Sequence, residues 1–142
     1  MLGSGTATAA AVVVTDPDRT LIARSYGAAH DPLWPLASVG KAVATVIALQ
    51  LAEEGALDLH APVQESLPWF SVRSRYGPIT LHHLLTHTSG LIASSDRAPA
   101  SGYDVLALAD TETGFAPGEH RHYSNVGYRT VGVALEAVTG EP

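Results

Sequence analysis

Residues 42–52 form a continuous uncharged run in the first half of the chain, and this run constrains the possible folds more than any other segment. Its alanine, valine, leucine and isoleucine residues favour a helix over about 38–54, and Gly55 follows as a stop signal. Apolar residues lie on every side of that helix. We therefore expect it to be a buried central element rather than a surface helix.

The only lysine of the chain, Lys41, stands at the beginning of this helix, three residues after Ser38. Residues three apart on a helix share a face, so the hydroxyl and the amine are expected to point the same way. Burial beside an apolar helix disfavours the charged form of an amine. A neutral amine next to a serine hydroxyl is a base beside its nucleophile.

A purely structural explanation of these two residues stays open at this point. The chain contains eleven serines, so a serine three residues before a lysine carries little weight alone. Serine is also a favourable helix N-cap, and a lysine in a first helical turn can extend its amine to water.

Composition indicates a globular chain, since 46% of its 142 residues are hydrophobic and 15% are charged. The net charge of −6 and the scattered arginines argue against nucleic acid and anionic membranes as partners. The absence of cysteine excludes disulfides, thiolate metal sites and cysteine nucleophiles. No apolar run approaches membrane-spanning length, and the run 7–14 has no basic segment before it. Compartment and oligomeric state stay unknown.

The rest of the chain predicts a mixture of strands and helices. Two extended segments, 8–14 and 21–28, flank the turn signal 16–19 and predict a β-hairpin. Capping residues and apolar spacing predict three further helices, at 81–87 after Thr80, at 103–110, and at 126–138 before Gly140.

The segment Tyr123-Ser124-Asn125 stands immediately before the last predicted helix. On an extended loop, residues two apart point to the same side. A tyrosine hydroxyl can relay a proton, and an amide can orient a substrate carbonyl or the lysine. Ser124 or Asn125 would also serve as an ordinary helix N-cap, and this explanation stays open as well.

Histidines suggest metal binding as another chemistry, because His83 and His87 are four residues apart on a predicted helix. The zinc-protease pattern needs a glutamate directly after the first histidine, and Leu84 stands there instead. We therefore expect no metal site. His87 is expected to hold the turn 88–90 by hydrogen bonds.

Taken together, these motifs resemble those of the serine β-lactamase and D-alanyl-D-alanine carboxypeptidase superfamily, in its class C and esterase branch. The resemblance runs nearly end to end and includes the opening hairpin. The matching segments are ASVGK at 37–41, LAEEGALDL at 51–59, ITLHHLLTHTSGL at 79–91, PG at 117–118 and YSNVGY at 123–128.

The resemblance implies a serine hydrolase that acts on an amide, ester or β-lactam carbonyl through an acyl-enzyme, without metal or organic cofactor. Ser38 would be the nucleophile, Lys41 would keep it activated, and Tyr123 would exchange protons with it. Asn125 would bind the substrate amide and support Lys41. The sequence leaves open which of Lys41 and Tyr123 is the acylation base. The partner implied is a small-molecule or peptide substrate.

The fold implied is α/β of the α+β type, β-lactamase/transpeptidase-like, with an antiparallel sheet packed by helices and an inserted helical subdomain. We expect one partial domain over residues 1–142. Within it, 1–55 would form the hairpin and nucleophile helix, 56–122 the helical subdomain, and 123–142 the tyrosine motif and following helix.

The family's third motif, lysine or histidine followed by a small residue and glycine, is not found among the 17 residues after Asn125. We therefore expect a truncated domain, the N-terminal portion of a serine hydrolase, with little turnover by itself. The alternative function is that of a non-catalytic remnant, at most a weak ligand-binding module.

Overall fold

The computed structural model describes residues 8–27, 33–92 and 111–141. The chain forms two compact units, 1–36 and 37–142. The helix predicted at 103–110 lies outside the described residues. Within the described ranges, no helix is long and apolar enough to cross a membrane.

The first unit contains an antiparallel β-hairpin of strands β1 (Ala10–Thr15) and β2 (Thr20–Tyr26). The Asp16 carboxylate closes the turn by accepting hydrogen bonds from the backbone N–H groups of Asp18, at 2.9 Å, and Arg19, at 2.8 Å. This is the way aspartate commonly stabilises a turn. The predicted hairpin is confirmed.

The second unit begins with a single 3-10 turn, Ala37–Val39, that leads into helix α1 (Gly40–Glu53). Gly55 adopts the left-handed conformation, φ +74°, just after the helix ends. Glycine takes this conformation without the steric cost that a side chain adds. The helix predicted from the uncharged run is confirmed.

The expected burial of α1 on every side is not found. Ala48 is its only fully buried residue, whereas Val43, Val46 and Leu49 are 51%, 54% and 52% exposed. The described contacts of α1 with other long elements are with helix α5 (Asn125–Thr139). One neighbouring helix covers one side of a helix, so apolar residues on the other sides stay exposed in this unit.

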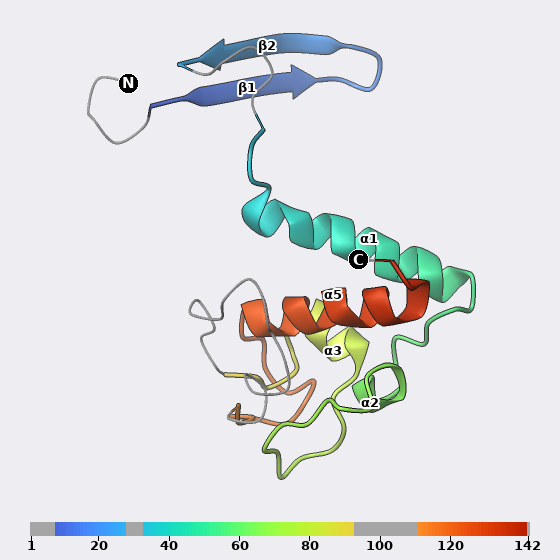
Figure 1. Ribbon diagram of the computed structural model, residues 1–142. Coiled ribbons are helices and arrows are strands. Elements are labelled where there is room, and N and C mark those ends of the chain that lie inside the picture. Colours follow the sequence, from blue (N-terminus) through green and yellow to red (C-terminus); the bar gives the residue numbers. More distant parts are fainter. Residues whose placement is uncertain (1–7, 28–32, 93–110, 142) are drawn as a thin grey trace. The chain divides into compact units, whose positions relative to one another are not determined.

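Helix α5 lies between α1 on one side and the short helices α3 (Leu81–Leu85) and α2 (Val63–Ser66) on the other, as Figure 1 shows. Its predicted apolar stripe is confirmed, and the fully buried residues of the helix are Val126, Gly127, Thr130, Val131, Ala134 and Leu135. The left-handed Gly140, φ +73°, ends the helix as expected.

Helix α3 starts at the predicted cap. The Thr80 hydroxyl accepts a hydrogen bond from the His83 N–H, and the His83 ring accepts one from the Thr80 N–H, both at 3.2 Å. This reciprocal arrangement is a capping box. The helix ends at Leu85, two residues earlier than predicted, because His87 takes a left-handed conformation with φ +61°.

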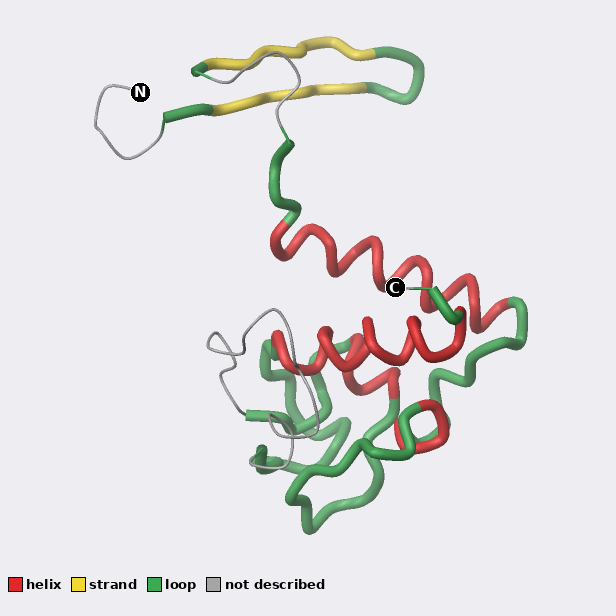
Figure 2. Tube along the Cα trace, viewed as in Figure 1, coloured by secondary structure: helices red, strands yellow, loops and turns green. Residues whose placement is uncertain are grey.

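Loops make up most of the described chain between α1 and α5, as Figure 2 shows. Isolated bridges join them, including Pro62 with Thr80 and Leu91 with Thr113. At Gly90, φ +80°, a Cβ atom would collide with the carbonyl oxygen of Phe115. Glycine is therefore required where this loop meets the chain that returns toward α5.

Replacement of Leu84 tests whether α5 and α3 share one core. Leu84 has no exposed surface, so Leu84→Ala should lower the free energy of unfolding by about 2–5 kcal/mol, since it removes buried methyl groups and leaves a cavity. Leu49→Ala is the matched control, at a helical leucine that is 52% exposed. Urea unfolding measures both, and equal losses for the two variants would contradict this packing.

Candidate active site

Ser38 lies in the 3-10 turn before α1, and its side chain is exposed. Its Oγ atom is 2.8 Å from the hydroxyl oxygen of Tyr123 and 3.4 Å from Nζ of Lys41, which donates to it. The N-cap position of α1 is held by Val39, and no side chain caps the helix. The alternative that Ser38 serves only as an N-cap is therefore wrong.

Lys41 lies in the first turn of α1 and is partly buried. Its Nζ atom is 5.0 Å from the centre of the Tyr123 ring and 5.6 Å from the centre of the Tyr128 ring, distances at which a cation is attracted by an aromatic face. Among the described residues, Lys41 forms no ion pair with a carboxylate. The amine is thus directed toward a hydroxyl and two aromatic rings.

Tyr123 reaches Ser38 from an extended segment that ends at the beginning of α5. Its two neighbours in the chain are bonded to one residue, His87: the His122 N–H donates to the His87 carbonyl at 2.8 Å, and the Ser124 N–H donates to Nδ1 of the His87 ring at 3.1 Å. Ser124 is the N-cap of α5 and accepts from the Gly127 N–H at 3.0 Å. The N-cap prediction for Ser124 is confirmed, and it is compatible with the placement of Tyr123 beside Ser38.

A second tyrosine supports the cluster from α5. The Tyr128 hydroxyl donates to the backbone carbonyl of Leu85 at 2.9 Å and lies 3.0 Å from Oγ1 of Thr45. Thr45 lies one turn after Lys41 on α1, and its hydroxyl also contacts the Lys41 carbonyl at 2.8 Å. These contacts connect α1, α3 and α5 next to Lys41.

Asn125 is the first residue of α5, two residues after Tyr123, and its side chain is exposed. A substrate-binding role for Asn125 stays a prediction.

His87 is buried, with 6% of its surface exposed. Burial lowers the pKa of His87 below its ordinary value of 6.5, and the positive charges of Arg121 and Lys41 lower it further. Because Nδ1 accepts a hydrogen bond, the neutral ring carries its proton on Nε2. Burial also lowers the pKa of His83, and electrostatic repulsion from the neighbouring His82 and His60 lowers it further.

The predicted role of His87 needs correction. The described hydrogen bonds of its ring and carbonyl go to the segment before α5 and not to the turn 88–90. In the described chain no group of three metal-binding side chains was found. Nδ1 of His83 and Nδ1 of His87 each accept a backbone hydrogen bond instead.

Sequence reasoning missed two residues of this cluster, Thr45 and Tyr128, and gave His87 the wrong hydrogen-bond partners. Thr45 could have been found, because a residue four positions after Lys41 on a helix shares its face. Tyr128 stands in a matched segment without any assigned role. The partners of His87 and Tyr128 are 37 and 43 residues away in the chain, beyond the reach of any local pattern.

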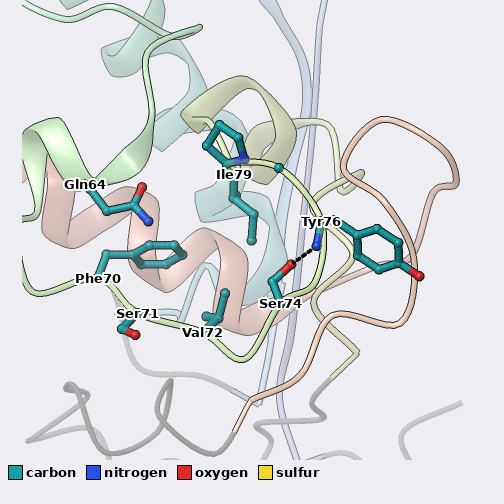
Figure 3. A pocket seen from close by; sticks show the side chains of 9 residues that line it. Gln64, Phe70, Ser71, Val72, Ser74, Tyr76 and Ile79 are labelled. Carbon is teal, nitrogen blue, oxygen red and sulfur yellow. Dashed lines mark hydrogen bonds between the residues drawn. The ribbon is translucent and has the colours of Figure 1, made fainter.

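A separate cavity of about 190 Å³ lies in the loops after α1 (Figure 3). The Tyr76 N–H donates to the Ser74 hydroxyl at its edge, at 3.1 Å. The cavity is lined by Gln64, Phe70, Ser71, Val72, Ser74, Tyr76, Gly77, Pro78 and Ile79. None of the four predicted site residues lines it.

The chain matches a known protein family over nearly its whole length. A protein-family model described as Beta-lactamase matches residues 2–142. The chain belongs to the β-lactamase family. The resemblance stated from the sequence motifs is thereby confirmed.

Relatives in this family include several hydrolases. Esterase EstB of Burkholderia gladioli is 35% identical over 134 residues, which cover 80% of this chain and 34% of the esterase. The β-lactamase/D-alanine carboxypeptidase of Yersinia pestis superposes with a TM-score of 0.74 at 27% identity, covering 96% of this chain and 44% of that one. EstCE1, a hydrolase with promiscuous acyltransferase activity, superposes with a TM-score of 0.77 at 28% identity, covering 95% and 43%.

These similarities confirm the fold class, an α+β chain of the β-lactamase/transpeptidase type with an antiparallel hairpin and helices. The chain spans 34% of the length of esterase EstB and 30% of the length of protein flp of Staphylococcus aureus.

The two histidines with lowered pKa values predict a loss of stability in mild acid. Below about pH 6.5, the unfolded chain takes up protons that His83 and His87 resist in the folded state, so the free energy of unfolding should fall as pH decreases through 6.5. Urea unfolding between about pH 7.5 and 5.5 measures this slope. The doubly substituted His83→Gln, His87→Asn chain should show a flatter profile, and an unchanged slope would assign the effect to other groups.

Proposed function

We propose that the chain carries the nucleophile of a serine hydrolase that acts through an acyl-enzyme. The observation that supports this most strongly is the hydrogen-bond distance of 2.8 Å between Ser38 Oγ and the Tyr123 hydroxyl, with the Lys41 amine 3.4 Å from the same Oγ. A nucleophile within hydrogen-bond reach of a proton acceptor is the arrangement that acyl transfer needs.

In the proposed acylation step, Ser38 Oγ forms a bond to the substrate carbonyl carbon while its proton passes to the Tyr123 and Lys41 pair. The pair accepts this proton in the state that lacks one proton, with either a tyrosine phenolate or a neutral amine. The tetrahedral intermediate then collapses, and the bond to the leaving group breaks as that group receives the proton. In the second half, a water attacks the ester carbon and gives a proton to the same pair. Ser38 regains a proton and the acid product leaves.

The beginning of α1 supports the negative charge that develops on the substrate oxygen. Ser38 stands two residues before Gly40, where the 14-residue helix starts. A helix N-terminus favours nearby negative charge by about 0.3–1 kcal/mol at an exposed position. The Ser38 backbone N–H is the oxyanion donor that we assign to this chain, a contribution worth roughly 3 kcal/mol where one such donor has been removed from an enzyme.

The proposed substrate is a small molecule or peptide with an ester, amide or β-lactam carbonyl. The relatives named above include an esterase and a β-lactamase/D-alanine carboxypeptidase, which supports this range. Asn125 is proposed to bind the substrate amide, because it is exposed at the start of α5 and follows Tyr123 by two residues.

Covalent labelling tests the nucleophile. The chain is incubated with a fluorophosphonate, a penicillin and an activated short-chain ester, and intact mass is recorded with peptide mapping. We expect one adduct, on Ser38, and none in Ser38→Ala. A folded wild-type chain that forms no adduct with any of the three probes would favour the non-catalytic remnant.

Removal of the Tyr123 hydroxyl tests the proton transfer. Tyr123→Phe should slow acylation of Ser38 on the order of 10²–10⁴-fold, which is the usual contribution of a positioned acid or base. Tyr76→Phe is the matched control, because its hydroxyl accepts from Arg75 outside the cluster. The second-order rate constant of labelling measures both, and equal rates for the two variants would remove Tyr123 from the mechanism.

A further inference from the structure

His87 has an unusual backbone for a residue with a side chain. It lies two residues after α3 with φ +61°, in the left-handed region, and only 6% of its surface is exposed. Residues with a Cβ atom enter this region at a cost in free energy, and histidine, asparagine and aspartate do so more often than others. Such a conformation persists where the surrounding contacts hold it in place.

The contacts that hold it are made with the chain on both sides of Tyr123. The His87 carbonyl accepts from the His122 N–H at 2.8 Å, and the His87 Nδ1 accepts from the Ser124 N–H at 3.1 Å. The backbone and the ring of one residue thus accept hydrogen bonds from the N–H groups of the residues directly before and after the tyrosine. This fixes the direction in which the Tyr123 side chain leaves the backbone.

The His87 ring also supports the two tyrosine rings. Its centre lies 4.5 Å from that of Tyr123 and 5.0 Å from that of Tyr128, with interplanar angles of 35° and 43°. Tyr128 is itself held by hydrogen bonds to Leu85 and Thr45. The Tyr123 ring therefore lies against a packed surface while its hydroxyl lies 2.8 Å from Ser38 Oγ.

We propose that His87 is the positioning residue of the Ser38–Tyr123 pair: in its neutral form, it holds the tyrosine hydroxyl at hydrogen-bond distance from the nucleophile. This inference rests on the function proposed above for Ser38 and Tyr123. The described contacts of the His87 ring and carbonyl are with Tyr123, its two chain neighbours and Tyr128, so His87 acts on the nucleophile through Tyr123.

The role requires the ring to be neutral. A second proton would have to enter at Nδ1, where it would face the Ser124 N–H and abolish the hydrogen bond. The titratable and charged groups that face His87 are Lys41 from α1, Tyr128 from α5, and Arg121 and Tyr123 from the segment before α5. The two cations among them oppose that second proton.

Two substitutions at position 87 separate positioning from folding. His87→Gly removes the ring and accepts φ +61° without strain. His87→Asn keeps an acceptor close to the position of Nδ1 and tolerates the same backbone. We expect His87→Gly to slow acylation of Ser38 by a fluorophosphonate on the order of 10–100-fold, since a misplacement of about 1 Å has effects of that size. His87→Asn should restore most of the rate.

A double-mutant cycle distinguishes a positioning role of His87 from a merely structural one. It compares the effect of His87→Gly on the acylation rate with and without the Tyr123 hydroxyl. If His87 acts through the tyrosine hydroxyl, His87→Gly should cause no further loss in a Tyr123→Phe background. A loss of the same size in both backgrounds would overturn the proposal. So would a folded His87→Gly chain that is labelled at the wild-type rate.

Nuclear magnetic resonance separates failure of this inference from failure of the proposed function. A wild-type chain that no probe labels would contradict the function, and the Tyr123 ring resonances then decide the positioning role. Nuclear Overhauser contacts between the Tyr123 ring and the beginning of α1 that weaken in His87→Gly and return in His87→Asn support it, and contacts unchanged in His87→Gly overturn it.

A pH titration decides the question if His87→Gly does not fold. We expect the acylation rate of the wild-type chain to fall in acid. The chemical shift of the Ser124 amide proton should change over the same pH range, and neither change is expected in His87→Asn. An equal decrease of the acylation rate at low pH in both proteins would overturn the role of His87.

Discussion

Helix α5 buries its apolar stripe against α1 on one side and against α3 and α2 on the other. Ser38 and Lys41 belong to the beginning of α1, and Tyr123 belongs to the segment that enters α5. The distance between the serine and the tyrosine hydroxyls is therefore determined by how these two helices pack. A change in the interior that shifts α5 along α1 would move the hydroxyls apart although no residue of the cluster had changed.

Hydrogen bonds between distant parts of the chain refine that packing. Tyr128 connects α5 to the end of α3 and to Thr45 of α1, while His87 connects the end of α3 to the segment before α5. Buried polar groups that satisfy one another in this way favour one arrangement of a core over its alternatives. The apolar stripe brings the helices together, and the polar contacts select the register at which the cluster forms.

The long helices and their ends could be predicted because their signals are local. The uncharged run predicted α1, and the spacing of Val131, Ala134 and Leu135 with Gly140 behind them predicted α5. Helix α1 is covered on fewer sides than its apolar composition predicts, as expected if the sheet that would cover it is incomplete. Composition tells which residues can be covered and not which neighbours are present to cover them. The α3 helix was predicted two residues too long, because the sequence gives no sign that position 87 adopts a positive φ.

In the candidate site, too, the contacts between residues close in sequence could be predicted from spacing and those between distant residues could not. The three-residue spacing of Ser38 and Lys41 predicted that their side chains point the same way, and Nζ of Lys41 lies 3.4 Å from Oγ of Ser38. Tyr123 is 85 residues from Ser38 in the chain, and only the resemblance of its motif to a family connected the two before the structure did. No spacing rule reaches the contacts of His87, which depend on tertiary structure alone.

The left-handed conformation at position 87 also restricts how this family member can vary. A replacement there has to tolerate a positive φ and to present a hydrogen-bond acceptor close to its own backbone. Histidine, asparagine and aspartate are the residue types enriched in that conformation, and all three carry such an acceptor. Their codons differ from one another only in the first nucleotide. A gene could therefore exchange these residues by single mutations without passing through an intermediate that lacks either property.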